Sequence, residues 1–461
     1  MPLSRVEIEE SPSAWPAYPA AVRGGGFVFV SGVRGAKPDG SATPVEDLPT
    51  KFTEHLQGYS LVDSMEGEAT AEAWTAHDNM GKALAASGSR QDQILRQRMW
   101  QRDKRLFPVL ERVRKLWQPE AAPSSGLGVR SVGGRNGNWY GIECIAVDLE
   151  DPNRLGSRQV LTPAEHAANP SASIYSQMVA SGPLVFLAGH IPIRTAEPGK
   201  PVVGSYDDVP KEGRFLATGR SHPDARDGPI AAQTWFVYNE IRRALEGDGM
   251  RMEDIVHVRI YLSDLRDLAA FHRVHRHFFE TDPPALCIVG FDEVGHKGCR
   301  IEIEPTALKR GSLRRESFEW RCPAPFAGPA ALRAGPLLFL AGMPGIDATG
   351  RIAMDSGSVA PEHAGKIASL EKTCSSPCVP SQIWWAWRRI YEACESACVE
   401  VSQIAKTVVY LRDESDLIAY EPIRTLIAPD SAPAFDCVVV ANPGPVDEAA
   451  VQIDATVLID S

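Results

Sequence analysis

Short apolar segments that end in glycine recur three times along the chain. They occupy residues 26–32, 182–189 and 335–342. Gly189 follows Gly32 by 157 residues, and Gly342 follows Gly189 by 153 residues. An apolar run of this length before a glycine is typical of a buried strand followed by a tight turn. Recurrence at nearly constant spacing predicts repeated copies of one structural unit.

The same order of elements follows each of these segments. Apolar residues at three- and four-residue steps predict a helix around Trp74, Trp235 and Trp384. Alternating segments predict strands at 94–100, 254–262 and 404–411, and second helices at 106–117, 267–280 and 416–427. Alternating strands at 141–147, 300–307 and 451–458 close the copies. We therefore expect an α+β fold in which each unit is a mixed sheet with two helices on one face.

The repeats divide the chain into three units, 1–152, 153–314 and 315–461. The segment 195–228 is rich in glycine, proline and aspartate and is predicted to be a long loop inside the second unit. The segment 356–381 is its expected counterpart in the third unit.

Composition narrows the class of protein. The 461 residues are 44% hydrophobic and 23% charged, which is typical of an ordinary globular chain and excludes a disordered, collagenous or coiled-coil protein. The 48 basic and 59 acidic residues give a net charge of -11, which disfavours a nucleic-acid partner. No signal peptide is visible, and five prolines and Arg333 interrupt the most apolar stretch, 322–346. The nine cysteines are too sparse for a disulfide scaffold and are expected to be reduced thiols. Together these features predict a cytoplasmic protein without a membrane partner.

Four motifs, in this order, resemble the Rid family, also called the YjgF/YER057c/UK114 family. In the second unit they are Ala-Gly-His-Ile-Pro at 188–192, Ser-Asp-Leu-Arg-Asp at 263–267, Phe-Phe followed by Pro-Pro-Ala at 278–285, and Ile-Glu-Ile-Glu at 301–304. The resemblance implies a chorismate-mutase-like fold, trimers with ligand clefts between subunits, and hydrolysis of enamines and imines to a ketone and ammonia. Three units in one chain would then form an intramolecular pseudo-trimer, which the uncovered face of each sheet also favours.

The resemblance also implies an arginine after Pro-Ala, whose fork-shaped guanidinium would grip a substrate carboxylate. The corresponding positions carry Leu286, Phe435 and, less surely, Ser125. Arg130 or Arg135 could supply a positive charge nearby, although solvation at the surface is the commoner role of arginine.

A glutamate that handles water is the family feature that the chain keeps. Glu304 matches it, with Glu143 and Asp454 as the counterparts in the other units. A carboxylate in a cleft can deprotonate water or protonate a leaving nitrogen, whereas the alternative is a carboxylate tied to backbone or lysine. Glu302, on the same strand, is expected to point to the opposite face.

Other candidate residues come from the same resemblance. Tyr18 and Tyr175 match a tyrosine that lines the cleft, and Cys287 and Cys437 stand near a cleft cysteine. His190 and His272 are candidate catalytic residues with Glu304, because imidazole exchanges protons near neutral pH. Glu143, Asp454, Tyr18, Tyr175, Cys287 and Cys437 are expected to bind substrate.

No cofactor or metal is predicted. His272 and His275 lack a third ligand at zinc spacing, and the four cysteines at 374, 378, 394 and 398 are better interpreted as buried apolar residues. The leading hypothesis is an enzyme that hydrolyses or rearranges a small enamine- or imine-type metabolite. The alternatives are a chorismatase-like hydrolase of an enol ether and a non-catalytic small-molecule-binding or chaperone-like module. The expected partner is a small-molecule substrate of a pseudo-trimeric monomer, with further dimerisation left open.

Overall fold

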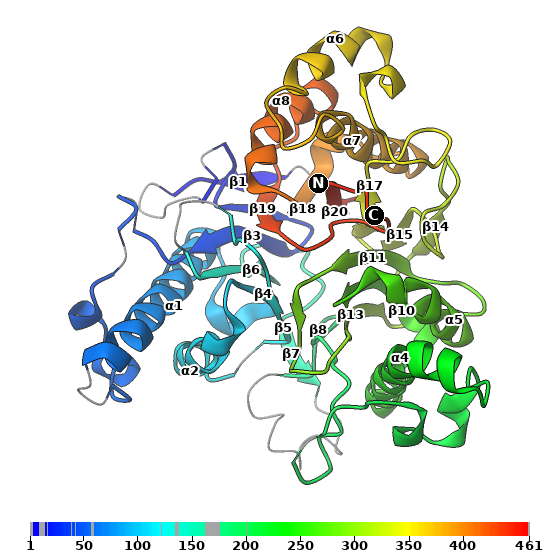
Figure 1. Ribbon diagram of the computed structural model, residues 1–461. Helices are drawn as coiled ribbons and strands as arrows, with labels where there is room; N and C mark the ends of the chain where they lie inside the picture. The colour runs from blue at the N-terminus through cyan, green and yellow to red at the C-terminus, as the bar shows by residue number, and fades with distance from the viewer. Residues whose placement is uncertain are drawn as a thin grey trace.

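The computed structural model describes residues 3–8, 14–15, 17–37, 39–41, 43–56, 60–120, 122–133, 138–161, 176–199 and 201–459. Their strands form three mixed sheets. Figure 1 shows the sheets toward the middle of the molecule and the main helices around the outside. No helix within the described ranges is long and apolar enough to cross a membrane.

The strands of each sheet come almost entirely from one third of the chain. The first sheet runs in the order β1 (Ser4–Val6), β2 (Ala21–Gly24), β3 (Phe27–Arg34), β6 (Tyr140–Val147), β4 (Ile94–Gln101), β5 (Ser124–Gly128) and β12 (Glu293–Val294). The second runs β7 (Arg158–Leu161), β8 (Met178–Ser181), β9 (Leu184–Leu187), β13 (Ile301–Leu308), β10 (Ile255–Leu262) and β11 (Ala285–Gly290). The third runs β14 (Arg315–Phe318), β15 (Ala331–Ala334), β16 (Leu337–Leu340), β20 (Val451–Leu458), β18 (Ile404–Leu411) and β19 (Ala434–Val439), and β17 (Met343–Pro344) also pairs with β20.

The three sheets share one topology. In each sheet a hairpin leads to the closing strand, which is antiparallel to both of its neighbours. The pairs β4–β5, β10–β11 and β18–β19 are parallel, and the first sheet alone adds the antiparallel β12 beyond β5. The register therefore aligns positions between sheets. Trp100, Tyr261 and Tyr410 stand opposite Gly141, Glu302 and Gln452, respectively.

Two helices cover the outer face of each sheet. They are α1 (Ser60–Ala86) and α2 (Phe107–Trp117), α4 (Ser221–Gly247) and α5 (Leu268–Phe278), and α7 (Val379–Ser396) and α8 (Leu417–Ile427). The predicted apolar stripes are buried in three separate cores, as with Met80, Tyr238 and Trp387. The sequence prediction of a mixed α+β fold is thus confirmed.

Two predicted segments differ in detail. Helix α4 begins at Ser221, so the last residues of the loop predicted at 195–228 are helical, and the loop itself carries short 3-10 turns. The matching segment of the third sheet contains a further helix, α6 (Pro361–Leu370), whose Pro361 occupies the first turn, where a missing N–H costs nothing.

The inner faces of the three sheets pack together. One apolar cluster draws on all three and includes Phe29, Phe186 and Phe339. A second cluster, with Trp100, Tyr261 and Tyr410, also draws on all three. Each sheet therefore buries its helix-free face against the other two.

Candidate functional site

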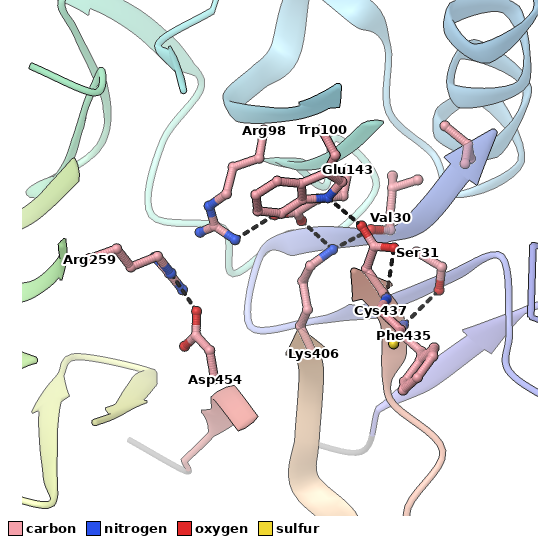
Figure 2. A network of polar contacts seen from close by, with 12 residues as sticks. Val30, Ser31, Arg98, Trp100, Glu143, Arg259, Lys406, Phe435, Cys437 and Asp454 are labelled. Carbon is pink, nitrogen blue, oxygen red and sulfur yellow. Dashed lines mark hydrogen bonds and ion pairs between the residues drawn. The ribbon is translucent and has the colours of Figure 1, made fainter. Parts of the chain in front are cut away.

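A layer of buried charges joins the inner faces of the sheets. Glu143, Glu304 and Asp454 occupy equivalent positions on β6, β13 and β20, and all three are at most 2% exposed. Arg98 Nη1 lies 2.5 Å from Glu143 Oε1, and Arg259 Nε lies 2.5 Å from Asp454 Oδ2. Figure 2 shows both pairs, together with the ion pair between Lys406 and Glu143.

Glu304 is the carboxylate with the most cations around it. The side chains of Arg98, Arg96 and Arg259 approach its Oε1 to 3.1, 3.2 and 3.3 Å. Burial alone would raise its pKa, but Arg98, Arg96 and Arg259 outweigh burial and lower the pKa to about 2. Glu304 is therefore ionised at neutral pH and engaged in ion pairs between the first and second sheets.

A pocket of about 390 Å³ lies between the first and second sheets. The first sheet and its second helix contribute Met99, Lys104, Phe107, Glu111, Ser124 and Gly126. The second part of the chain contributes Gln177, Gly189, His190, Ile191, Ile193, Thr195, Glu240, Gly295, His296 and Glu302. The lining includes Glu302 but not Glu304.

Glu302 therefore shares the inner face with Glu304, and the expectation that it points away was wrong. Residues two apart on a strand face the same side of a sheet. Burial raises the pKa of Glu302 to about 8; Lys104 lowers it and the negative charge of Glu304 raises it. At neutral pH the Glu302 carboxyl is mostly protonated, beside a pocket large enough for a small molecule.

Gly189, two residues after the end of β9, lies where the two sheets meet at this pocket. The Gly189 N–H donates to the Ser124 carbonyl at 3.1 Å. A Cβ on Gly189 would collide with Glu302 Oε1 and would lie 2.6 Å from Ser125 Oγ. The next residue, His190, pairs with Ile303 through its backbone, and its Nδ1 lies 2.8 Å from the Ala188 carbonyl. The recurrent glycine thus leaves room for a carboxyl group.

Lys104 is the lysine of the pocket lining. Its Nζ donates to the Gly126 carbonyl at 2.7 Å and lies 5.0 Å from the ring centre of Phe107. Burial lowers its pKa, although the negative charges of Glu302, Glu293 and Glu111 oppose that effect. The acid and the amine of the pocket are therefore electrostatically coupled.

Between the second and third sheets the equivalent positions carry different chemistry. Gln452 occupies the position that corresponds to Glu302, and its Nε2 donates to the Ile288 carbonyl at 2.8 Å. Leu286 stands where the first sheet has Ser124, so the assignment of Ser125 to that position from the sequence was wrong by one residue. Cys287 is buried, with its Sγ 3.7 Å from Gln452 Nε2, and burial raises the pKa of its thiol. An amide cannot exchange a proton as a carboxyl does.

Between the third and first sheets an aromatic pair and an ion pair lie at the equivalent positions. Phe435 stands at the Ser124 position, and the ring of Tyr18 stacks on it at 4.1 Å. The Tyr18 hydroxyl donates to Glu421 Oε2 at 2.5 Å. Gly141 takes the Glu302 position, where a Cβ would lie 2.8 Å from Arg34 Nη1. Arg34 in turn pairs with Asp436 at 2.7 Å.

The remaining candidates lie apart from the pocket lining. Cys437 is buried beside Asp436, whose Oδ1 accepts from its backbone N–H at 2.9 Å. His272 lies on α5, where burial lowers its pKa to about 4, and it does not line the pocket with His190. Arg130 is a surface residue paired with Asp292 at 3.2 Å. Tyr175 and Arg135 lie outside the described residues.

Metal ligands do not gather in the part of the chain that the structure describes. No group of three or more His, Cys, Asp or Glu side chains there could hold a metal ion. Of the six aligned positions at the three interfaces, only Glu302 carries a carboxyl group, and it lines a pocket.

Comparison with known proteins places this α+β fold in a family. The family model described as Endoribonuclease L-PSP matches residues 165–309. A RutC family protein of Pyrococcus horikoshii is 30% identical over 135 residues, which are 29% of this chain and 86% of that protein. A 2-iminobutanoate/2-iminopropanoate deaminase of Dermatophagoides farinae is 32% identical over 77 residues, covering 17% of this chain and 59% of that protein.

The chain therefore belongs to the Endoribonuclease L-PSP family, the YjgF/YER057c/UK114 or Rid family. This confirms the resemblance drawn from the motifs, and the matched segment corresponds to the second sheet. A chorismatase crystal structure is 13% identical, covering 79% of this chain and 93% of its own, with a TM-score of 0.43. At that similarity it carries no argument about activity.

Sequence reasoning missed Glu302 and Lys104. The two-residue strand period could have placed Glu302 beside Glu304. No sequence signal connects Lys104 with Glu302, because the two meet only through the packing of the first and second sheets.

Proposed function

We propose that the chain hydrolyses a small imine or enamine to a carbonyl compound and ammonia in the pocket between the first and second sheets. The observation that carries the proposal is Glu302, a buried carboxyl that lines the pocket and has a pKa of about 8. A general acid–base group works best when its pKa lies near the working pH. Family membership, and the name of the deaminase relative, support the same reaction class.

The three sheets, in this proposal, are three Rid units that form a pseudo-trimer within one chain, with boundaries near residues 152 and 314. The shared topology and the shared inner clusters support this arrangement. A single chain allows the three interfaces to differ, so one can carry chemistry while Gln452 and Gly141 occupy the equivalent positions in the others.

The protonated Glu302 carboxyl starts the reaction on an enamine by donating its proton to the β-carbon, which yields an iminium ion and a carboxylate. The carboxylate then takes a proton from water as the water oxygen attacks the iminium carbon. The resulting carbinolamine receives that proton on nitrogen, the C–N bond breaks, and ammonia leaves. The hydroxyl proton returns to Glu302 as the C=O bond forms, so the carboxyl is regenerated.

The neighbours of Glu302 support these steps. His190 lines the same pocket, and we assign it the orientation of the attacking water. Lys104 electrostatically favours the carboxylate form of Glu302, which must exist transiently after the first proton transfer. Glu304 has the opposite role in this proposal, because its low pKa suits a permanent charge in the ion layer rather than proton exchange.

The test is the rate of ammonia release by the Glu302→Gln variant. This substitution keeps the shape of the side chain and removes its acidity. We expect the enzymatic rate on an imine generated in situ to fall by about 10²–10⁴, the usual contribution of a general acid–base group. The melting temperature of the variant should equal that of the wild type. Glu395→Gln, which alters a surface carboxylate 2.8 Å from Arg321, is the control and should leave the rate unchanged.

If the wild-type protein hydrolyses no imine of a panel faster than the spontaneous reaction, the enzyme proposal is wrong and the protein is a binding module. Full activity in Glu302→Gln would move the chemistry to another group.

A further inference from the structure

The charges that line the pocket restrict the substrates it can hold. Among the described residues that line it, three are glutamates, Glu111, Glu240 and Glu302, and none is arginine. Lys104 is the only lysine among the described residues of the lining. Glu302 is mostly protonated at neutral pH, and Glu111 and Glu240 pair with Arg114 at 2.6 Å and Arg243 at 3.0 Å. The described lining therefore offers an incoming carboxylate no arginine and the single ammonium of Lys104.

Lys104 already has partners within the protein that compete with a substrate carboxylate. Its Nζ already donates to the Gly126 carbonyl at 2.7 Å, and three acidic neighbours, Glu302, Glu293 and Glu111, act on its charge. A substrate carboxylate bound there would also lose water in a largely buried site. Desolvating a charge is costly unless a well-placed cation compensates for it.

The rest of the wall favours an apolar body. Met99 and Phe107 line the pocket from the first sheet and α2, and Ile191 and Ile193 line it from the segment after β9. Side chains of this kind bind a ligand by removing apolar surface from water, at about 25 cal/mol per Å². The C=N group must lie at Glu302 for hydrolysis, which leaves these apolar side chains to contact the rest of the substrate.

We infer that the substrate is an imine or enamine with an apolar body and no carboxylate, the class of compound that forms by oxidation of an amine rather than of an amino acid. This inference rests on the proposed function and specifies its substrate. The absence of a carboxylate suits a described lining without arginine, and the apolar body suits Met99, Phe107 and the two isoleucines.

Two imines that differ by the carboxylate alone provide the test. An amine oxidase generates 2-phenylethanimine from phenethylamine, and an amino-acid oxidase generates 2-imino-3-phenylpropanoate from phenylalanine. We expect kcat/KM for ammonia release, after subtraction of spontaneous hydrolysis, to be at least about tenfold higher for 2-phenylethanimine, which is about 1.4 kcal/mol in transition-state binding. Equal rates, or a preference for the imino acid, would overturn the inference.

A substitution in the pocket tests the cause of that preference. Ser124 lines the pocket at the start of β5, so Ser124→Arg adds a guanidinium to it. We expect this variant to shift the ratio toward the imino acid by about tenfold or more. Ser369→Arg, at an exposed position on α6, is the control and should keep the wild-type ratio. An unchanged ratio in a folded Ser124→Arg variant would contradict the charge argument.

Binding without turnover separates this inference from the proposed reaction. Phenethylamine should raise the melting temperature of the wild-type protein, and 3-phenylpropanoate at the same concentration should not. If phenethylamine binds but neither imine is hydrolysed, the hydrolase proposal fails and the ligand preference stands. If 3-phenylpropanoate stabilises the protein as well or better, the ligand preference fails.

Discussion

Two glutamates on one strand have opposite electrostatic surroundings. Glu304 faces three arginines and has a pKa of about 2, whereas Glu302, two residues earlier, has a pKa raised to about 8. Both residues belong to one Ile-Glu-Ile-Glu motif, and the family resemblance pointed to Glu304 as the glutamate that handles water. Which glutamate borders a cavity depends on Arg96 and Arg98, which come from a strand about two hundred residues away.

Glu304→Gln should destabilise the fold rather than remove an acid. Removal of one partner of a buried ion pair leaves unpaired charge inside and costs about 3–5 kcal/mol. We expect the free energy of unfolding in urea at pH 7 to fall by about that amount. Glu395→Gln should change it by less than about 0.5 kcal/mol, as surface substitutions do.

The pH dependence gives an internal check on Glu304. A lowered pKa means that its stabilising effect is fully present above about pH 4.5 and is lost as the pH falls through about 2. The stability difference between the wild type and Glu304→Gln should shrink over that interval. A fully stable variant that had lost only turnover would assign the proton chemistry to Glu304.

At the scale of elements, periodicity predicted most of the fold. The strand expected at 404–411 is β18 (Ile404–Leu411), and the helix expected at 416–427 is α8 (Leu417–Ile427), because their apolar positions follow the period of each element. Helix α6 was not predicted within the insertion at 356–381. The short two-residue strand β12, which extends the first sheet from the second part of the chain, carries no local signal of its partner.

The glycine that follows β9, Gly189, stands where a side chain would collide with Glu302. Gly189→Ala would push a methyl group against Glu302 Oε1, so the carboxyl must move. Misplacement of a catalytic group by about 1 Å can cost on the order of 10² in rate, and we expect a loss of that size in ammonia release. Gly365→Ala on α6 has no neighbouring atom within 4 Å and should be neutral or slightly stabilising. A fully active Gly189→Ala variant would contradict the placement of Glu302.

At the scale of the whole molecule, the inequality of the three interfaces is the main result. Their aligned positions carry Glu302 with Ser124, Gln452 with Leu286, and Gly141 with Phe435. The repeats in the sequence predicted several units, but the partners at each interface come from distant parts of the chain. The sequence could therefore indicate the kind of site without showing which interface retains a carboxyl beside a cavity.

The protonation of Glu302 is the property on which the account depends most. The direct measurement is a carbon-13 NMR titration of protein labelled at the glutamate carboxyl carbons, with Glu302→Gln used to assign the signal. The account predicts a midpoint near pH 8, so that the carboxyl is protonated at neutral pH and ionises only above it. A midpoint near 4.5, the ordinary value of a glutamate, would mean that Glu302 is a carboxylate at neutral pH and would contradict its role as the acid of the pocket.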